Sequence, residues 1–317
     1  MSPSQPDGPA PFLFLVGCGR SGTTLLRAMC DAHPELAVPP ESHVLVTLAP
    51  RGADAFDPID GGSLAGCLAA DERFGLWGLD ATTLRDVIGP APADYPTAIR
   101  AVFRAWTEDH AGGKARYADK TPVYVLHIAR LAELFPEAVF VHLVRDGRDV
   151  AASFLELGWA DTIEDAALHW KLRVTRGRRA GRRLAPGRYV EVHYEDLVGE
   201  PERTLRTICA AAGLAYDGAM LDPSGSSADI VATTRHPEYH GHLTRPPTAG
   251  LRDWRRDLDV GDVARFEALA GATLGAFGYE RAVPGPTLAT RAAAAAHLAR
   301  WQVHRVRRRL TGPTSAP

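Results

Sequence analysis

A strand-like apolar run, a glycine-rich turn and a helix-forming segment follow one another in residues 12–34, FLFLVGCGRSGTTLLRAMCDAHP. Residues 12–16 are all apolar, as in a parallel strand that is buried on both faces. Glycines interrupt residues 17–22, and residues 23–29 have the pattern of an amphipathic helix. This order predicts a central strand of an α/β sheet that leads into an anion cradle of backbone N–H groups and a helix start.

The residues of this turn differ from the sequence pattern of loops that bind nucleoside triphosphates. Gly17 and Gly22 have the spacing of the G-x-x-x-x-G-K-[ST] pattern, but Thr23 stands where the lysine belongs. Because that lysine contacts the β- and γ-phosphates, its absence disfavours a kinase or ATPase. An arginine earlier in the loop and several hydroxyls instead suit a dianionic, diphosphate-like group. The residues expected to hold this group are Arg20, Ser21, Gly22, Thr23 and Thr24.

The run GRSGTTLL, followed by a helix that ends in Asp-Ala-His-Pro, resembles the 5′-phosphosulfate loop of sulfotransferases that use PAPS (3′-phosphoadenosine 5′-phosphosulfate). Its continuation, LRAMCDAHP, most resembles the tyrosylprotein sulfotransferases and their bacterial relatives. The resemblance implies the P-loop-like sulfotransferase fold, an α/β fold with a mostly parallel central sheet of about five strands flanked by helices. It also implies that PAPS is the co-substrate, that it binds across the C-terminal ends of the strands, and that no metal is required.

A second anion motif follows another buried-type strand, residues 139–144. A nucleoside triphosphatase would place a metal-binding aspartate directly after this run, but the chain has Arg145. Together with Ser153, eight residues later, Arg145 resembles the family's 3′-phosphate motif, and the resemblance assigns both residues to that phosphate. Arg148 and Asp149 between them are expected to pair locally.

Glu41 begins an apolar-periodic segment after two prolines. An acid in a first helical turn can complement the helix dipole, whereas a partly desolvated carboxylate can take the proton of an attacking hydroxyl. The resemblance implies the second role, because the tyrosylprotein relatives have a glutamate at this place. His43 is a rival base and remains open, since many cytosolic sulfotransferases use a histidine.

Lys120 ends a short predicted strand, residues 116–120, just before a proline-started helix. Ligands of open α/β sheets gather at such strand ends. The ammonium could meet the charge that develops on the oxygen between sulfur and the 5′-phosphate, which favours the transition state over the ground state. The relatives carry a lysine here, so the resemblance assigns Glu41, Lys120 and Arg20 to catalysis.

Two further cofactor contacts rest on resemblance alone. The sequence YEDL resembles the family's YE-x-L, in which the tyrosine lies near the adenosine, so Tyr194 is a candidate; core packing explains it equally well. Residues 223–252 form a loop longer than ordinary connections. The family's corresponding loop folds over the 3′-phosphate, which makes Arg245 a candidate contact.

Composition limits the remaining possibilities. The formal net charge of −2 gives no general reason to expect nucleic-acid binding, and the four cysteines have no disulfide or metal-ligand spacing. With neither a signal peptide nor a membrane span in the pattern, the chain is expected to be cytoplasmic. The expected organisation is a disordered tail at 1–11, a sulfotransferase domain at 12–280, and an Ala/Arg-rich C-terminal helix and tail at 281–317, whose role is open.

These observations predict an enzyme that transfers the sulfuryl group of PAPS to a hydroxyl acceptor by in-line displacement. A peptide tyrosine, a sugar, a lipid and a secondary metabolite all remain possible acceptors, and the oligomeric state is open. Two alternatives are retained: a P-loop nucleotide kinase, and a module that binds the nucleotide without catalysis.

Overall fold

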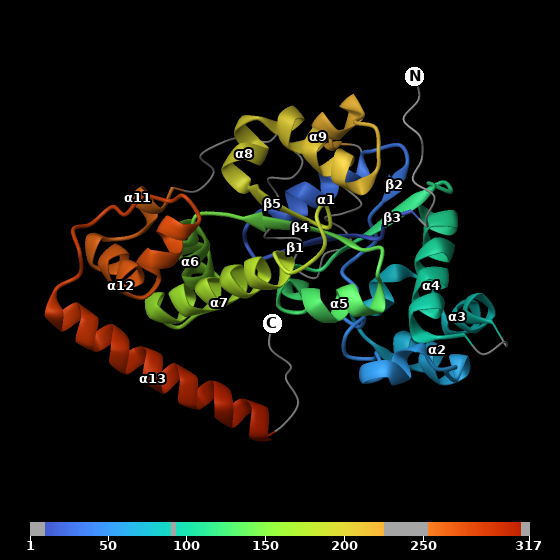
Figure 1. Ribbon diagram of the computed structural model, residues 1–317, viewed down its shortest axis with the longest axis horizontal. Coiled ribbons are helices and arrows are strands. Elements are labelled where there is room, and N and C mark those ends of the chain that lie inside the picture. Colours follow the sequence, from blue (N-terminus) through green and yellow to red (C-terminus); the bar gives the residue numbers. More distant parts are fainter. Residues whose placement is uncertain (1–9, 90–92, 225–252, 312–317) are drawn as a thin grey trace. The chain divides into compact units, whose positions relative to one another are not determined.

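The computed structural model describes residues 10–89, 93–224 and 253–311, with side chains described as far as residue 303 (Figure 1). Arg245 and most of the expected N-terminal tail lie outside these residues. The chain divides into two compact units. Unit 1 takes its described residues from 10–17, 22–143 and 177–224, and unit 2 takes them from 18–21, 144–176 and 253–311.

A five-stranded sheet, in the order β2-β3-β1-β4-β5, forms the centre of unit 1. β1 pairs in parallel with β3 and with β4, and β2 pairs in parallel with β3. This confirms the predicted α/β class and the mostly parallel sheet of about five strands. The strands are β1 (Leu13–Gly17), β2 (Leu36–Ala37), β3 (Arg116–Lys120), β4 (Val139–Val144) and β5 (Tyr189–His193).

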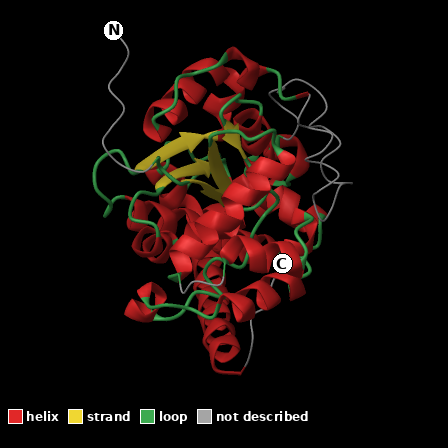
Figure 2. Ribbon diagram, turned by 90° about the vertical axis from the view of Figure 1, so that its right-hand side faces the viewer, coloured by secondary structure: helices red, strands yellow, loops and turns green. Residues whose placement is uncertain are grey.

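Helices cover both faces of this sheet, which is why β1 is apolar throughout. Successive side chains of a strand point to opposite faces, so Phe14 and Val16 join one apolar cluster while Leu13 and Leu15 join another. Figure 2 shows the strands enclosed by helices. The first cluster contains side chains of α2 (Gly61–Ala70), α3 (Ala81–Ile88), α4 (Tyr95–His110) and α5 (Ile128–Leu134), and the second contains those of α1 (Thr23–Asp31), α8 (Tyr194–Gly199) and α9 (Pro201–Ala212).

Short 3₁₀ helices connect these elements. One of them, η2, contains Phe74 and Trp77, which are both 1% exposed and stack on each other in the first cluster. The aromatic residues of this region therefore serve the core. The 3₁₀ helices are η1 (Gly52–Phe56), η2 (Phe74–Trp77), η3 (Pro122–Leu126) and η4 (Gly218–Leu221).

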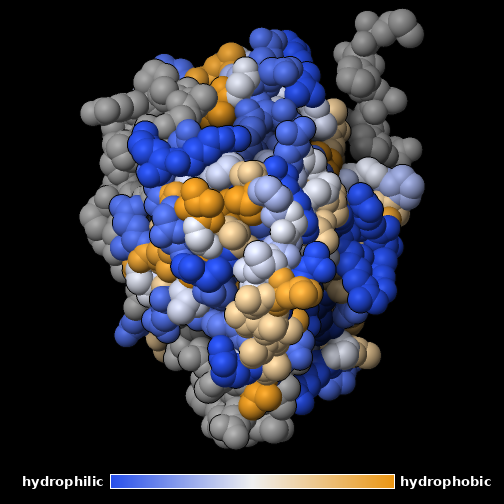
Figure 3. Space-filling model, turned by 90° about the vertical axis from the view of Figure 1, so that its left-hand side faces the viewer, coloured by the Kyte–Doolittle hydropathy of each residue, from blue (hydrophilic) through white to orange (hydrophobic). Residues whose placement is uncertain are grey.

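Unit 2 is helical and has an apolar cluster of its own, which includes Trp170 and Phe266. A Cβ atom on Gly147 would lie 2.5 Å from Trp170 and 2.7 Å from Phe266, so this helix start packs without room for a side chain. On the face shown in Figure 3, hydrophobic residues occur in groups between hydrophilic ones. The elements are α6 (Gly147–Glu156), α7 (Ile163–Gly181, shared with unit 1), α11 (Trp254–Asp257), α12 (Val260–Ala276) and α13 (Leu288–Thr311).

Candidate active site

The loop after β1 requires glycine at both of its ends. A Cβ on Gly17 would lie 2.6 Å from the carbonyl oxygen of Leu143 in the neighbouring strand. Gly22 has φ +92°, in the left-handed region, and a Cβ there would lie 2.4 Å from the ring of Tyr194. Tyr194, a predicted cofactor contact, therefore packs against the last residue of the loop, and its side chain is buried.

Among the described residues, no side chain caps the start of α1. Gly22 is the N-cap residue and offers no side chain, and the described first turn contains no acidic residue. The first N–H groups of a helix need an acceptor, and the dipole favours a negative one. Thr23 is buried and Thr24 is half-buried in this turn. In unit 2, the hydroxyl of Ser21 is buried and has no hydrogen-bond partner among the described residues. Both observations fit the phosphosulfate group that the sequence predicts here.

Glu41 and Lys120 form an ion pair in unit 1, between Oε1 and Nζ. Lys120 is the last residue of β3 and its side chain is 1% exposed, whereas the Glu41 side chain is 32% exposed. The structure thus brings together the two residues of this unit that the sequence assigned to catalysis. It also places the lysine at the carboxyl end of a strand, as predicted, with Leu15 of β1 as its register partner.

Burial and charge act in opposite directions on this pair. Burial disfavours the carboxylate of Glu41, but Lys120 and the hydrogen bond from His43 outweigh that effect and hold the pKa of Glu41 well below its usual value. Burial also lowers the pKa of Lys120, and Glu41 offsets only part of that shift. In this arrangement Glu41 is ionised, and it therefore has the protonation state that a general base needs.

Asp119 precedes Lys120 in β3 and is fully buried. Neither carboxylate oxygen accepts a hydrogen bond from the described residues, although the hydroxyls of Ser42 and Thr121 lie close enough to lower its pKa. Burial is the larger effect and raises the pKa of Asp119 to about 6. Asp119 was not among the residues predicted from the sequence; the signal available was an acid inside an otherwise buried strand.

His43, the rival base, contacts Glu41 directly. Its Nε2 lies 2.7 Å from Oε2 of Glu41, and its backbone has φ +51°. The two candidate bases are therefore hydrogen-bonded to each other. Arg73, whose Nη1 lies 3.0 Å from Nδ1 of His43, was missed, because no local pattern links an arginine to a histidine 30 residues earlier.

The two predicted anion motifs contribute residues that meet in unit 2. Nε of Arg20 donates a hydrogen bond to the hydroxyl of Ser153 on α6 over 3.0 Å, and the Arg20 guanidinium lies over the ring of Trp159 at 5.9 Å. Arg20 has φ +66°, a left-handed conformation that is uncommon for a residue other than glycine. A loop residue and a residue of the second motif, 133 positions apart, are therefore in direct contact.

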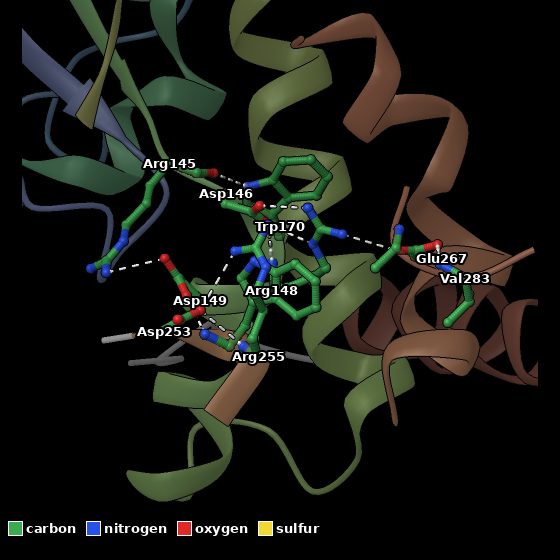
Figure 4. A network of polar contacts seen from close by, with 11 residues as sticks. Arg145, Asp146, Arg148, Asp149, Trp170, Asp253, Arg255, Glu267 and Val283 are labelled. Atoms are coloured by element: carbon green, nitrogen blue, oxygen red, sulfur yellow. Dashed lines mark hydrogen bonds and ion pairs between the residues drawn. The ribbon is translucent and has the colours of Figure 1, made fainter. Parts of the chain in front are cut away.

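Arg145 follows β4 and is held by neighbouring groups of unit 2 (Figure 4). Its Nη2 lies 3.3 Å from Oδ2 of Asp149, and its carbonyl oxygen accepts from Nε1 of Trp170 over 3.2 Å. The other oxygen of Asp149 accepts from the backbone N–H of Trp254 over 2.8 Å. Asp149 thus pairs with a residue close in sequence, as predicted. It also accepts a hydrogen bond from Trp254, which is far away in sequence.

Arg148 has a structural position. Its guanidinium contacts Asp146 at 2.7 Å and Glu267 at 2.9 Å, and it lies over the ring of Trp254 at 3.9 Å (Figure 4). Arg148 and Glu267 are both almost fully buried. The pairing with Asp146 is the local one expected, whereas the pairing with Glu267 spans 119 residues and was not foreseen.

The described residues contain neither a cluster of metal-ligating side chains nor a helix that could span a membrane. In the ranges 10–89, 93–224 and 253–311, no three or more His, Cys, Asp and Glu side chains lie together as metal ligands would. Within the same part of the chain, no helix is long and apolar enough to cross a membrane.

The chain is similar to known proteins in sequence and in structure. The model of the sulfotransferase family matches residues 11–218, more than half of the chain. Protein-tyrosine sulfotransferase 1 of Danio rerio is 29% identical over 284 residues, which cover 85% of this chain and 72% of that enzyme. The nodulation protein NoeE of Sinorhizobium fredii is 27% identical over 326 residues, covering 88% and 69%.

A further relative matches the chain over a shorter segment, and a solved structure has a similar fold. Over 137 residues the chain is 31% identical to the omega-hydroxy-beta-dihydromenaquinone-9 sulfotransferase Stf3 of Mycobacterium tuberculosis, with 39% of this chain and 35% of that enzyme covered. The sulfotransferase domain of the Synechococcus olefin synthase superposes with a TM-score of 0.61 at 26% identity, covering 88% of this chain and 98% of that domain. The match of the family model over more than half of the chain, together with these relatives, shows that the chain is an enzyme of the sulfotransferase family.

Proposed function

We propose that this enzyme transfers the sulfuryl group of PAPS to a hydroxyl acceptor. PAPS supplies an activated sulfur, on which the bond from the acceptor oxygen forms as the bond to the bridging phosphate oxygen breaks. Arg20 to Thr24 hold the 5′-phosphosulfate, and Arg145 and Ser153 hold the 3′-phosphate. Tyr194 contacts the adenosine side, and Arg245 is a further candidate for the 3′-phosphate.

Two residues of unit 1, Glu41 and Lys120, have separate roles in the proposed reaction. Glu41 accepts the proton of the acceptor hydroxyl at a carboxylate oxygen, and Lys120 stabilises the negative charge on the departing phosphate oxygen. The observation that carries the proposal is the ion pair between these two side chains at the end of β3. A base and a cation held in contact, with the cation buried, suit a reaction that moves a proton and develops an anion in one step.

The relationship between the two loops also supports the proposal. Gly17 and Leu143 are register partners at the ends of β1 and β4, so the phosphosulfate loop and the Arg145 loop leave adjacent strands. Ligands of open α/β sheets bind at such carboxyl ends. The Ser21 hydroxyl has no hydrogen-bond partner among the described residues, and none of their side chains caps the start of α1. Both can therefore donate to an anionic group.

The acceptor is proposed only as an oxygen nucleophile. One relative is named for protein tyrosine, which carries a phenol, and another for an omega-hydroxy compound. Both groups are largely protonated at neutral pH, so either needs a base such as Glu41.

Calorimetry with PAP (the desulfated product), ADP and ATP tests the donor. Binding of PAP much tighter than binding of ADP supports the proposal, because only PAP carries the 3′-phosphate. Preference for ATP with Mg²⁺ would restore the kinase alternative. Transfer of labelled sulfate from PAPS to a panel of a tyrosine peptide, a sugar and a long-chain alcohol then identifies the acceptor class; PAP binding without transfer to any acceptor, including a cell extract, would favour a non-catalytic module.

A further inference from the structure

His43 lies between two charged side chains of unit 1. Its Nε2 is 2.7 Å from Oε2 of Glu41, and its Nδ1 is 3.0 Å from Nη1 of Arg73. Arg73 precedes η2 and belongs to the helical region that separates β2 from β3. The three residues therefore form a chain of contacts that leads from this region to the carboxylate at the end of β3.

The chemistry of arginine fixes the direction of both hydrogen bonds. A guanidinium has N–H donors and no acceptor, so Nδ1 of His43 must accept from Arg73. The ring is then neutral, with its proton on Nε2, and Nε2 donates to Glu41. In this state the only lone pair of the ring is already occupied, which leaves His43 without a position from which to accept a proton.

The backbone around His43 is fixed by buried hydroxyls. The N–H of Ser42 donates to the Thr121 hydroxyl over 3.1 Å, and the N–H of Leu45 donates to the Tyr124 hydroxyl over 2.9 Å. Between these two anchors, His43 has φ +51°, a conformation that is sparsely populated by residues with a Cβ. Such a conformation persists only where the surroundings hold it, and here they keep the imidazole directed at Glu41.

Two of the described side chains donate to the Glu41 carboxylate. Lys120 pairs with Oε1 and His43 bonds to Oε2. If Lys120 stabilises the departing oxygen during transfer, His43 remains to orient the carboxylate. Further charged groups that act on Glu41 or its partners include Arg73, which contacts His43, and the buried Arg27 and Asp119.

We propose that His43 and Arg73 are positioning residues for Glu41: Arg73 sets the tautomer of His43, His43 orients the carboxylate, and Glu41 rather than His43 receives the acceptor proton. This inference rests on the proposed function for its catalytic consequence. The tautomer itself does not depend on that function.

Nitrogen NMR of histidine-labelled protein tests the tautomer without any substrate. Comparison with His43→Gln identifies the His43 signals among those of the 12 histidines. We expect a protonated Nε2 and an unprotonated Nδ1 at neutral pH in the wild-type protein. A protonated Nδ1 would overturn the inference, whether or not the protein binds PAP; failure to bind PAP with the expected tautomer present would count against the proposed function alone.

Kinetics of Arg73→Ala test the positioning role, with Arg85→Ala on the exposed surface of α3 as the matched control. PAP affinity should stay within about twofold in both variants. Arg73→Ala should lose about tenfold in kcat, because the tautomer of His43 is then no longer fixed and Nε2 no longer always donates to Glu41. In the nitrogen NMR spectrum of this variant, Nδ1 of His43 should carry the proton in part of the molecules. Equal kcat in the two variants, or an unchanged His43 tautomer in Arg73→Ala, would contradict the role of Arg73.

The variant His43→Gln tests whether His43 acts as a hydrogen-bond donor to Glu41 or as the general base. Its side-chain amide can still donate toward Glu41 but cannot accept a proton at neutral pH. We expect a loss of about tenfold or less, compared with about a hundredfold or more for Glu41→Gln. The double variant with Arg73→Ala should lose no more activity than His43→Gln alone, because Arg73 acts through the imidazole. If His43→Gln loses as much activity as Glu41→Gln while still binding PAP, His43 is the base and the inference is wrong.

Discussion

Arg20 donates a hydrogen bond from Nε to the hydroxyl of Ser153, over 3.0 Å and across 133 residues of the chain. The first residue lies in the loop after β1 and the second on α6, the helix that follows β4. Because Ser153 is only 2% exposed, the guanidinium reaches into the interior of unit 2 to make this contact. The loop arginine and the predicted 3′-phosphate serine are therefore in direct contact.

Replacement of Ser153 by alanine should weaken PAP binding by about tenfold or more. The change removes a predicted contact to the 3′-phosphate and also the group that orients Arg20, and a hydrogen bond to a charged group contributes about 1.5–3 kcal/mol. Calorimetric titration with PAP measures the loss. Ser63→Ala, on the exposed helix α2, is the control and should bind PAP as the wild-type protein does; unchanged affinity in Ser153→Ala would remove this serine from the site.

The Glu41→Gln variant should bind PAP normally and lose on the order of 10²-fold or more in kcat, the scale expected when a general base is removed. Glutamine is similar in size but does not take a proton. Single-turnover transfer of labelled sulfate measures the rate, and Glu35→Gln, at an exposed position, is the control. Retention of full activity would show that another group takes the proton.

For Arg145→Ala we expect a selective loss of affinity. PAP should bind far more weakly, whereas adenosine 5′-phosphosulfate, which has no 3′-phosphate, should bind almost as before. Competition binding with the two ligands measures this difference, and Arg176→Ala, also in unit 2 but exposed, controls for the loss of one positive charge. Equal weakening of both ligands would mean that Arg145 is assigned to the wrong phosphate.

Arg148→Ala should act on stability. Its removal leaves the buried carboxylate of Glu267 and the carboxylate of Asp146 without their shared cation, and breaking a buried pair in this way costs about 3–5 kcal/mol. Urea unfolding measures the change. Arg255 stacks on the same Trp254 ring but is 69% exposed, so Arg255→Ala should cost less than about 1 kcal/mol. Similar losses in the two variants would argue against a structural role that is specific to Arg148.

Asp119→Asn should make the protein more stable than the wild type at pH 7–8, and the difference should shrink as the pH falls. Burial raises the pKa of Asp119 to about 6 in the folded protein, above the ordinary value of about 3.9. The folded state therefore binds this proton more tightly, and stability falls as the pH rises through about 6. The full difference corresponds to about 3 kcal/mol.

Thermal unfolding between about pH 4 and pH 8 measures this dependence. Asp86→Asn replaces an exposed carboxylate on α3 and should show no such trend. A stability difference that does not change with pH would mean that Asp119 keeps one protonation state throughout this range.

The sequence by itself determined the elements that short, local patterns of residues predict. The apolar runs 12–16 and 139–144 specify two buried strands. The glycines after the first run and the arginine after the second predict that an anion-binding loop follows each strand. Strand alternation and burial on both faces then require the helical layers that the structure has. These features could be read because their cause, a repeating environment along a strand or a helix, acts between near neighbours in the chain.

Only the tertiary structure decided which side chains meet. Arg20 and Ser153, Glu41 and Lys120, and His43 and Arg73 are separated by 133, 79 and 30 residues, and no periodicity encodes such pairs. The resemblance to a family named four of these residues as functional and left the base undecided between Glu41 and His43. The arrangement of donors around the imidazole, which depends on an arginine from a distant helical segment, is what favours Glu41.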